Sequence, residues 1–189
     1  AIDEITNTSL TILNRLGLYK QGEVSNLDIY KTKSKGTIAG EGASFFLLAN
    51  EASATDYAKL DGLHTFYKPD GIPEIERQVN LFFEKQDISI NEIDLIITGK
   101  NGDAGSDEVY ESLSKTVFAG KNSINYKNLC GEYPTAAAFA MWLAAIIVKS
   151  GNVPATIEYK DSNEEKIKKV LVYNHYQGIH HSLSLLSAC

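Results

Sequence analysis

A stretch without any charged side chain, residues 136–148, constrains the fold more than any other feature of this sequence. It reads Ala-Ala-Ala-Phe-Ala-Met-Trp-Leu-Ala-Ala-Ile-Ile-Val, which is apolar on every face of a helix, so we expect a helix buried on all sides. Thr135 is placed to cap its start and Gly151 to end it. Because a bilayer-spanning helix needs about 20 apolar residues, this run is too short to cross a membrane. The rest of the chain should therefore surround this helix.

Composition indicates an ordinary globular protein. The chain has 189 residues, of which 43% are hydrophobic and 22% charged, and we expect one domain over residues 1–189. A net charge of −6 disfavours nucleic acid and anionic membranes as partners. Two cysteines, Cys130 and Cys189, do not make a disulfide framework, and residues 1–22 lack the apolar core of a signal peptide. We therefore expect a cytoplasmic protein in a reducing compartment.

The first residue is Ala1 and the one methionine is Met141, so we expect the chain to be a processed, engineered or proteolytic piece of a longer protein.

Periodicity and turn residues predict an alternation of strands and helices. The predicted helices are a short one ending at Gly17, then 71–86, 107–118 and 136–148. The predicted strands are 44–49, 54–60 (with a continuation towards Tyr67), 94–98, 123–126, 155–159, 170–174 and 182–186. Residues 20–35 are predicted as an exposed connection and 160–169 as a charged turn. The order favours an α/β layer sandwich whose mixed sheet has an antiparallel part.

Several segments, in order, resemble the later half of the β-ketoacyl synthases, the thiolase-like condensing enzymes. Ala1-Ile2-Asp3-Glu4 resembles the segment after their nucleophile region, and residues 40–43 match their Gly-Glu-Gly-Ala. Residues 99–107 fall where they carry His-Gly-Thr-Gly-Thr, and 127–132, Lys-Asn-Leu-Cys-Gly-Glu, where they carry Lys-Ser-x-x-Gly-His before an Ala-rich helix. The tail, 174–186, is similar to their last loop and strand. The resemblance implies a thiolase-like half-fold.

The same resemblance places this chain apart from the active members of the family. Gly99 and Glu132 stand where the family has its two catalytic histidines, whereas Lys127 and Gly102 match the family pattern. Glycine has no side chain, and an ionised glutamate would repel a developing enolate. The family's cysteine nucleophile would precede Ala1. Besides these positions, Asn101, Gly102 and Gly178 are pocket candidates.

Other reactive residue types have simpler interpretations. Cys130 is expected to be a buried structural thiol, and Cys189 to be exposed. His180 and His181 are adjacent, so on a strand they face opposite ways and cannot share a metal site, with His175 nearby.

His64 is alone in the sequence. Asp103, Asp107 and Glu108 lack the spacing of a calcium loop, and we expect them to form the solvated, acidic start of a helix. We expect no metal and no cofactor.

Three hypotheses follow from the sequence. In the first, the chain is a non-catalytic ketosynthase-like subunit of fatty-acid or polyketide synthesis, similar to chain-length-factor-type subunits. Its partners would be an acyl carrier protein and an active ketosynthase subunit or its own N-terminal half, in a homo- or heterodimer. In the second, the full-length parent is an active condensing enzyme with Lys127, Asn101 and Glu132 lining a shifted pocket. In the third, the chain is a standalone binding or structural domain. A lone half of such a fold should expose a large apolar face.

Overall fold

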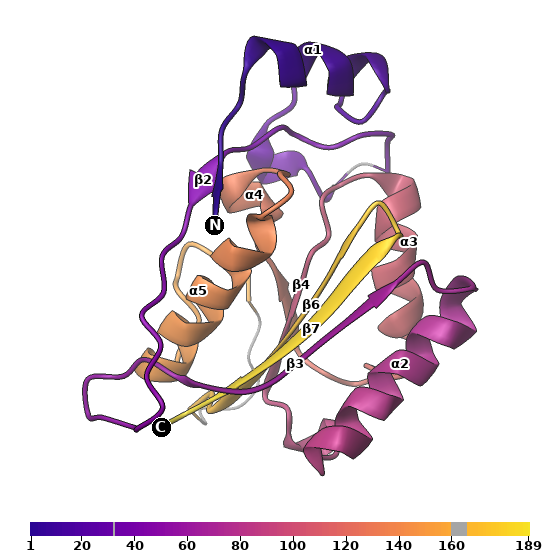
Figure 1. The fold of residues 1–189 in the computed structure, drawn as a ribbon. Helices are drawn as coiled ribbons and strands as arrows, with labels where there is room; N and C mark the ends of the chain where they lie inside the picture. The colour runs from indigo at the N-terminus through magenta and orange to yellow at the C-terminus, as the bar shows by residue number, and fades with distance from the viewer. Residues whose placement is uncertain (32, 160–165) are drawn as a thin grey trace.

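A computed structural model describes residues 1–31, 33–159 and 166–189 of the chain. Its centre is a five-stranded sheet in the order β3-β7-β6-β4-β5 (Figure 1). The strands are β3 (Lys59–Tyr67), β4 (Leu95–Thr98), β5 (Ser123–Asn125), β6 (Lys169–Tyr176) and β7 (His180–Ser187). β4 is parallel to β5 and to β6, whereas β7 runs antiparallel to both β6 and β3. The sheet is therefore mixed, and the α/β fold class predicted from the sequence is confirmed.

Helices cover both faces of this sheet. α5 (Ala136–Ser150) lies on one face, and α2 (Gly71–Gln86) with α3 (Ala104–Leu113) on the other (Figure 1). Each face has its own hydrophobic cluster, one centred on α5 with Leu95, Ile97 and Val172, the other containing apolar residues of α2 and α3. The residues of β4 are buried on both sides, as expected of a central parallel strand.

The helix ends follow local chemistry. Asp103 caps α3 by accepting a hydrogen bond from the Ser106 backbone N–H at 2.8 Å. Thr135 occupies the N-cap position of α5 as predicted, but its side chain does not cap the helix. The Asp3 carboxylate does so instead, accepting from the Thr135 N–H at 2.9 Å and from its hydroxyl at 2.6 Å. Gly151, with φ +75°, ends α5 in the left-handed conformation.

The N-terminal segments lie at one end of the sheet (Figure 1). β1 (Ile2–Asp3) pairs with β2 (Gly42–Ala43) in a separate two-stranded sheet. Between them come α1 (Asn7–Arg15) and the short 3₁₀ helix η1 (Asn26–Asp28). A second 3₁₀ helix, η2 (Ile90–Glu92), precedes β4, and the four-residue α4 (Lys127–Cys130) follows β5. Among the helices that the structure describes, none combines the length and apolarity that crossing a bilayer requires.

Two predicted strands are wrong. Residues 44–49 are irregular, with Phe45 80% and Leu47 99% exposed, because the pairing that begins in β2 stops at Ala43. Residues 155–159 are also irregular, and Ile157 reaches the core from a turn. A short apolar run is as typical of a buried loop or of a binding surface as it is of a strand, which explains both errors.

The other boundaries moved less. The predicted strand 54–60 starts at Lys59 and continues to Tyr67, and the helix predicted at 107–118 spans Ala104–Leu113. Most of the predicted turn 160–169, residues 160–165, lies outside the described residues.

The expectation that the apolar helix is buried on all sides is wrong for this chain alone. Ala140, Leu143 and Ile147 of α5 are buried against the sheet, but Trp142 on another face is 46% exposed. Met141 is only half-buried. The helix therefore keeps an apolar face that no described residue of this chain covers completely.

Candidate functional site

Gly99, one of the positions singled out from the sequence, lies at the carboxyl ends of three parallel strands together with two residues that were not predicted. Gly99 follows β4, Tyr126 follows β5, and Asn174 lies near the end of β6. In the register Thr98 pairs with both Asn125 and Tyr173, so the next residues of the three strands form a row. This edge is where open α/β sheets place their ligands.

Gly99 has no space for a side chain. A Cβ at this position would lie 2.0 Å from Asn174 Oδ1 and 2.6 Å from the Tyr110 hydroxyl oxygen. Asn174 Oδ1 is held there by the Tyr126 hydroxyl, which donates to it at 3.0 Å. The space beside Gly99 is therefore filled by the Asn174 side chain. Asn174 and Tyr126 were not predicted from the sequence. They lie at the ends of β6 and β5, the two strands that pair with β4.

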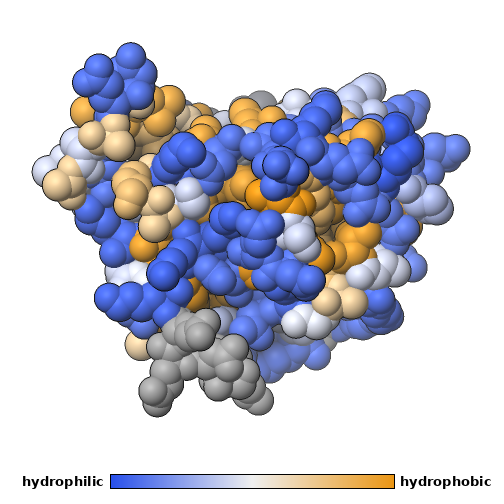
Figure 2. Space-filling model, turned by 90° about the horizontal axis from the view of Figure 1, so that it is seen from below, coloured by the Kyte–Doolittle hydropathy of each residue, from blue (hydrophilic) through white to orange (hydrophobic). Residues whose placement is uncertain are grey.

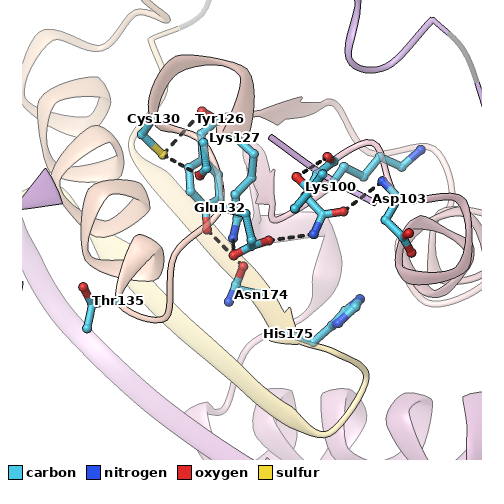
Figure 3. Close-up of polar contacts among 12 residues, drawn as sticks. Lys100, Asp103, Tyr126, Lys127, Cys130, Glu132, Thr135, Asn174 and His175 are labelled. Carbon is cyan, nitrogen blue, oxygen red and sulfur yellow. Dashed lines mark hydrogen bonds and ion pairs between the residues drawn. The ribbon is translucent and has the colours of Figure 1, made fainter. Parts of the chain in front are cut away.

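Lys127 and Glu132 form a buried ion pair (Figure 3). The Lys127 side chain is 1% exposed, and its Nζ donates to Glu132 Oε1. Glu132 Oε2 accepts from Asn101 Nδ2 at 2.6 Å. The Lys127 ammonium thus balances the Glu132 carboxylate, and the pair has no net charge.

The loop from Asn101 to Asp107 is held by its own carboxylates. Asp107 accepts from the backbone N–H of Asn101 at 2.9 Å and of Gly102 at 3.1 Å. Burial raises the pKa of Asp107, while these hydrogen bonds oppose the rise. Gly102, at φ +80°, packs so closely on Ile29 that a Cβ would lie 2.5 Å from its carbonyl oxygen. Asp103 and Asp107 are therefore structural and lie at the start of a helix as expected, but the expectation that this helix start is solvated is wrong for Asp107, which is buried.

The Gly-Glu-Gly-Ala segment positions Glu132. A Cβ on Gly40 would lie 2.0 Å from the Cys130 carbonyl oxygen, and one on Gly131 would lie 2.6 Å from Gly40 Cα. This close approach lets the Gly40 N–H donate to the Glu132 carbonyl at 3.0 Å, while the Glu132 N–H donates to the Ile38 carbonyl at 2.8 Å. The contact between Gly40 and Gly131 thus fixes the backbone of Glu132, and it was not predicted from the sequence.

Two of the three clustered histidines lie together inside the protein. His175 and His181 are paired across the β6–β7 hairpin, with ring centroids 5.3 Å apart. His181 is buried and His180 exposed on the opposite side, as their adjacency predicted. The ring of His180 instead packs on Tyr67.

The ring nitrogens of His175 are both occupied. Its Nε2 lies 3.0 Å from the Ser106 carbonyl oxygen and its Nδ1 lies 3.1 Å from the Gly178 N–H, which fixes the neutral tautomer protonated on Nε2. Burial, with a smaller effect of His181, lowers the pKa of His175 to about 4. His175 is therefore not placed to act as a general base.

The cysteines offer no activated nucleophile. Cys130 is half-buried, and burial raises the pKa of its thiol to about 11, so the thiolate is scarce at neutral pH. Cys189 is an exposed free thiol. The described residues contain no group of three or more His, Cys, Asp or Glu side chains that could hold a metal ion.

A cavity of about 350 Å³ opens beside these residues. Asn101, Glu132, His175 and Gly178 line it, so two of the three pocket candidates lie on its wall. Gly102, the third, is buried and is not part of the wall, and neither are Gly99 and Lys127. Leu13, Leu16 and Leu18 line it too, from α1 and the residues after it.

Comparison with known proteins places the fold. No protein-family model matches the sequence, and no curated protein matches it. Among solved structures, an ishigamide ketosynthase/chain length factor is 15% identical with a TM-score of 0.76, and covers 100% of this chain and 52% of its own. A β-ketoacyl synthase from Burkholderia phymatum STM815 is also 15% identical, with a TM-score of 0.66 and coverages of 100% and 53%.

A third similar structure is a type II PKS acyl carrier protein in complex with its ketosynthase bound to the hexaketide, at 13% identity, a TM-score of 0.74 and coverages of 100% and 55%. The chain thus spans about half the length of the structures it matches. Its fold is the thiolase-like fold of ketosynthases, as the sequence motifs predicted.

Proposed function

We propose that this chain is a ketosynthase-like, non-catalytic half-subunit that supports fatty-acid- or polyketide-type chain assembly by an active partner. The observation that carries the proposal is the state of the two histidine positions within a ketosynthase fold. Gly99 is closed by Asn174, and Glu132 is neutralised by Lys127. The fold of the condensing enzymes is present, while the two histidines that their reaction needs are replaced by a glycine without a side chain and by a glutamate paired with Lys127.

The chemistry of the site supports this assignment. Decarboxylative condensation requires hydrogen-bond donors aimed at the oxygen that becomes negative. Glu132 presents acceptor oxygens there, and the Lys127 ammonium is turned into the carboxylate rather than towards the cavity. Both ring nitrogens of His175 are engaged in hydrogen bonds, so this side chain is unsuited to act as a base. The raised pKa of the Cys130 thiol makes it unsuited to act as a nucleophile.

The partners are proposed from the apolar surface and the matched structures. The exposed side of α5 around Trp142 and the apolar run with Phe45, Leu47 and Leu48 would be covered by a second half-fold. Figure 2 shows further apolar side chains reaching the surface between polar ones on the lower face. A ketosynthase in complex with its acyl carrier protein is among the similar structures, which supports a carrier protein as the second partner. We propose a dimeric assembly in the cytoplasm.

A condensation assay tests the proposal. The purified chain is incubated with a hexanoyl carrier protein and a malonyl carrier protein, and the 3-oxoacyl product is measured by mass spectrometry. We expect no product from the chain alone or from Gly99→His, since Glu132 remains and the new side chain meets Asn174. A β-ketoacyl synthase assayed with the same carriers serves as the positive control. Turnover by the isolated chain would refute the non-catalytic assignment and favour an active condensing enzyme.

A further inference from the structure

The cavity beside Glu132 has an apolar roof and a polar floor. Leu13, Leu16 and Leu18 line it from the side of α1, and Glu132 and Asn101 from the side of the sheet. At about 350 Å³ it has the size of a small-molecule site. α1 itself has no fully buried residue, and Leu16 is 64% exposed. The roof therefore offers apolar surface that a bound molecule would remove from water.

Some polar side chains of the cavity are committed to the protein, and Tyr19 and Tyr176, which each carry a hydroxyl group, line it as well. Asp103 accepts from the backbone N–H groups of Gly36 at 2.5 Å and Ser106 at 2.8 Å. His175 uses both ring nitrogens, as described above. Asn101 donates to Glu132 through Nδ2 and accepts from the Asp103 N–H through Oδ1 at 3.0 Å. His175 and Asn101 therefore have little left to offer a ligand, whereas each oxygen of Asp103 can accept a further hydrogen bond.

Glu132, like Asp103, retains acceptor capacity. Each of its carboxylate oxygens receives one hydrogen bond, one from Lys127 and the other from Asn101. A carboxylate has about four acceptor sites, so roughly two remain for a molecule in the cavity. Of the described residues that line the cavity, Lys35 is the only lysine or arginine, and it is exposed. The polar end of the cavity is thus an acceptor of hydrogen bonds.

We propose that this cavity binds an elongated apolar molecule whose buried end is a hydrogen-bond donor, such as a primary amide or an amine, and that it excludes carboxylates. The alkyl part lies against Leu13 of α1 and against Leu16 and Leu18, which follow it, and the N–H groups donate to Glu132. A carboxylate at the same place has no proton to donate, so its oxygens would face the acceptor oxygens of Glu132 in a partly dehydrated cavity. The inference goes beyond the proposed function because it concerns binding by this chain without a partner subunit.

Three ligands with one alkyl chain test the proposal. Decanamide, decylamine and decanoate are titrated into the purified protein below their micelle concentrations, and binding is measured by isothermal titration calorimetry. We expect the amide and the amine to bind at least about 10-fold more tightly than decanoate, equivalent to about 1.4 kcal/mol. Equal binding of decanoate, or no binding of any of the three ligands, would overturn the proposal.

Variants locate the binding and the selectivity. Val109→Trp places an indole at the cavity wall and should abolish binding, whereas Val24→Trp, at an exposed valine outside the cavity, should not. The double variant Lys127→Met/Glu132→Gln removes the carboxylate without leaving an unpaired lysine, and should reduce the preference for the amide over decanoate to about twofold or less. Retained binding in Val109→Trp would place the ligand elsewhere. Retained selectivity in the double variant would show that Glu132 is not its source. A double variant that did not fold would leave the wild-type ligand series to decide.

Discussion

The ion pair of Lys127 and Glu132 gives the sharpest energetic prediction. Glu132→Gln leaves the lysine charge buried, with its side chain 1% exposed, and removing one partner of such a pair costs about 3–5 kcal/mol of unfolding free energy. Lys127→Met leaves a carboxylate that keeps its bond from Asn101 and faces the cavity, so we expect a smaller loss of about 1–3 kcal/mol. The double variant has neither charge and should lie within about 2 kcal/mol of the wild type.

The double-mutant cycle is measured by urea unfolding followed by circular dichroism. The coupling energy should be at least about 2 kcal/mol, because the double variant loses less than the sum of the single ones. Glu74→Gln, which removes one partner of the exposed pair with Arg77, is the control and should change stability far less. Additive effects at Lys127 and Glu132, or a single loss below about 1 kcal/mol, would refute the description of a buried, mutually dependent pair.

Three further predictions concern other parts of the chain. Gly99→Ala should lower the unfolding free energy by about 1–3 kcal/mol, because its Cβ overlaps Asn174 Oδ1, and Asn174→Ala in the same chain should restore part of the loss in urea unfolding. Unchanged stability of Gly99→Ala would contradict the contact. His175 has a folded pKa of about 4 against an ordinary 6.5, so the unfolded chain takes up the proton first as pH falls. Stability is complete above pH 6.5 and should decrease by about 3 kcal/mol as pH falls to about 4. His175→Gln should flatten that slope in denaturation curves recorded at several pH values and His180→Gln should not; a slope unaffected by His175→Gln would disprove the assignment. Trp142→Glu should leave the isolated chain folded, at a cost of about 1 kcal/mol for the lost packing on Phe139, and should weaken the concentration-dependent association that we expect of the wild type in light scattering. Equal association of the variant and the wild type would show that this face of α5 is not an interface.

The sequence was informative where periodicity and local chemistry agree. The helix over 71–86 has its predicted bounds, and the strands at 94–98, 123–126, 170–174 and 182–186 all appear, within two residues at each end. Their order was enough to predict a mixed sheet with helices. The family motifs then predicted the thiolase-like fold, which the similar structures share.

The errors arose at segments whose burial depends on which other part of the protein packs against them. Residues 44–49 and α5 are apolar, and apolarity was interpreted as burial, yet Leu47 and Trp142 face outward in this chain. An apolar composition indicates that a segment is suited to packing, but it does not indicate whether the packing partner belongs to the same chain.

Contacts between distant segments could not be predicted either. The closure of Gly99 by Asn174, the crossing of Gly40 over Gly131 and the cap that Asp3 provides to α5 each join residues far apart in sequence. Distances between such residues depend on the register of the strands. A single sequence specifies register only through the alternation of apolar and polar residues on the two faces of a strand. The identity of Glu132 as a replacement was visible from the motif, whereas its pairing with Lys127 was not.

Covalent acyl loading tests the central claim most directly. The native chain is incubated with a hexanoyl thioester of N-acetylcysteamine, and its intact mass is measured before and after, with a β-ketoacyl synthase as the positive control. We predict an unchanged mass for the native chain, because burial raises the pKa of the Cys130 thiol to about 11 and its reactive thiolate is scarce at neutral pH. A rapidly formed single acyl adduct on Cys130 would contradict the claim that this half-fold is non-catalytic.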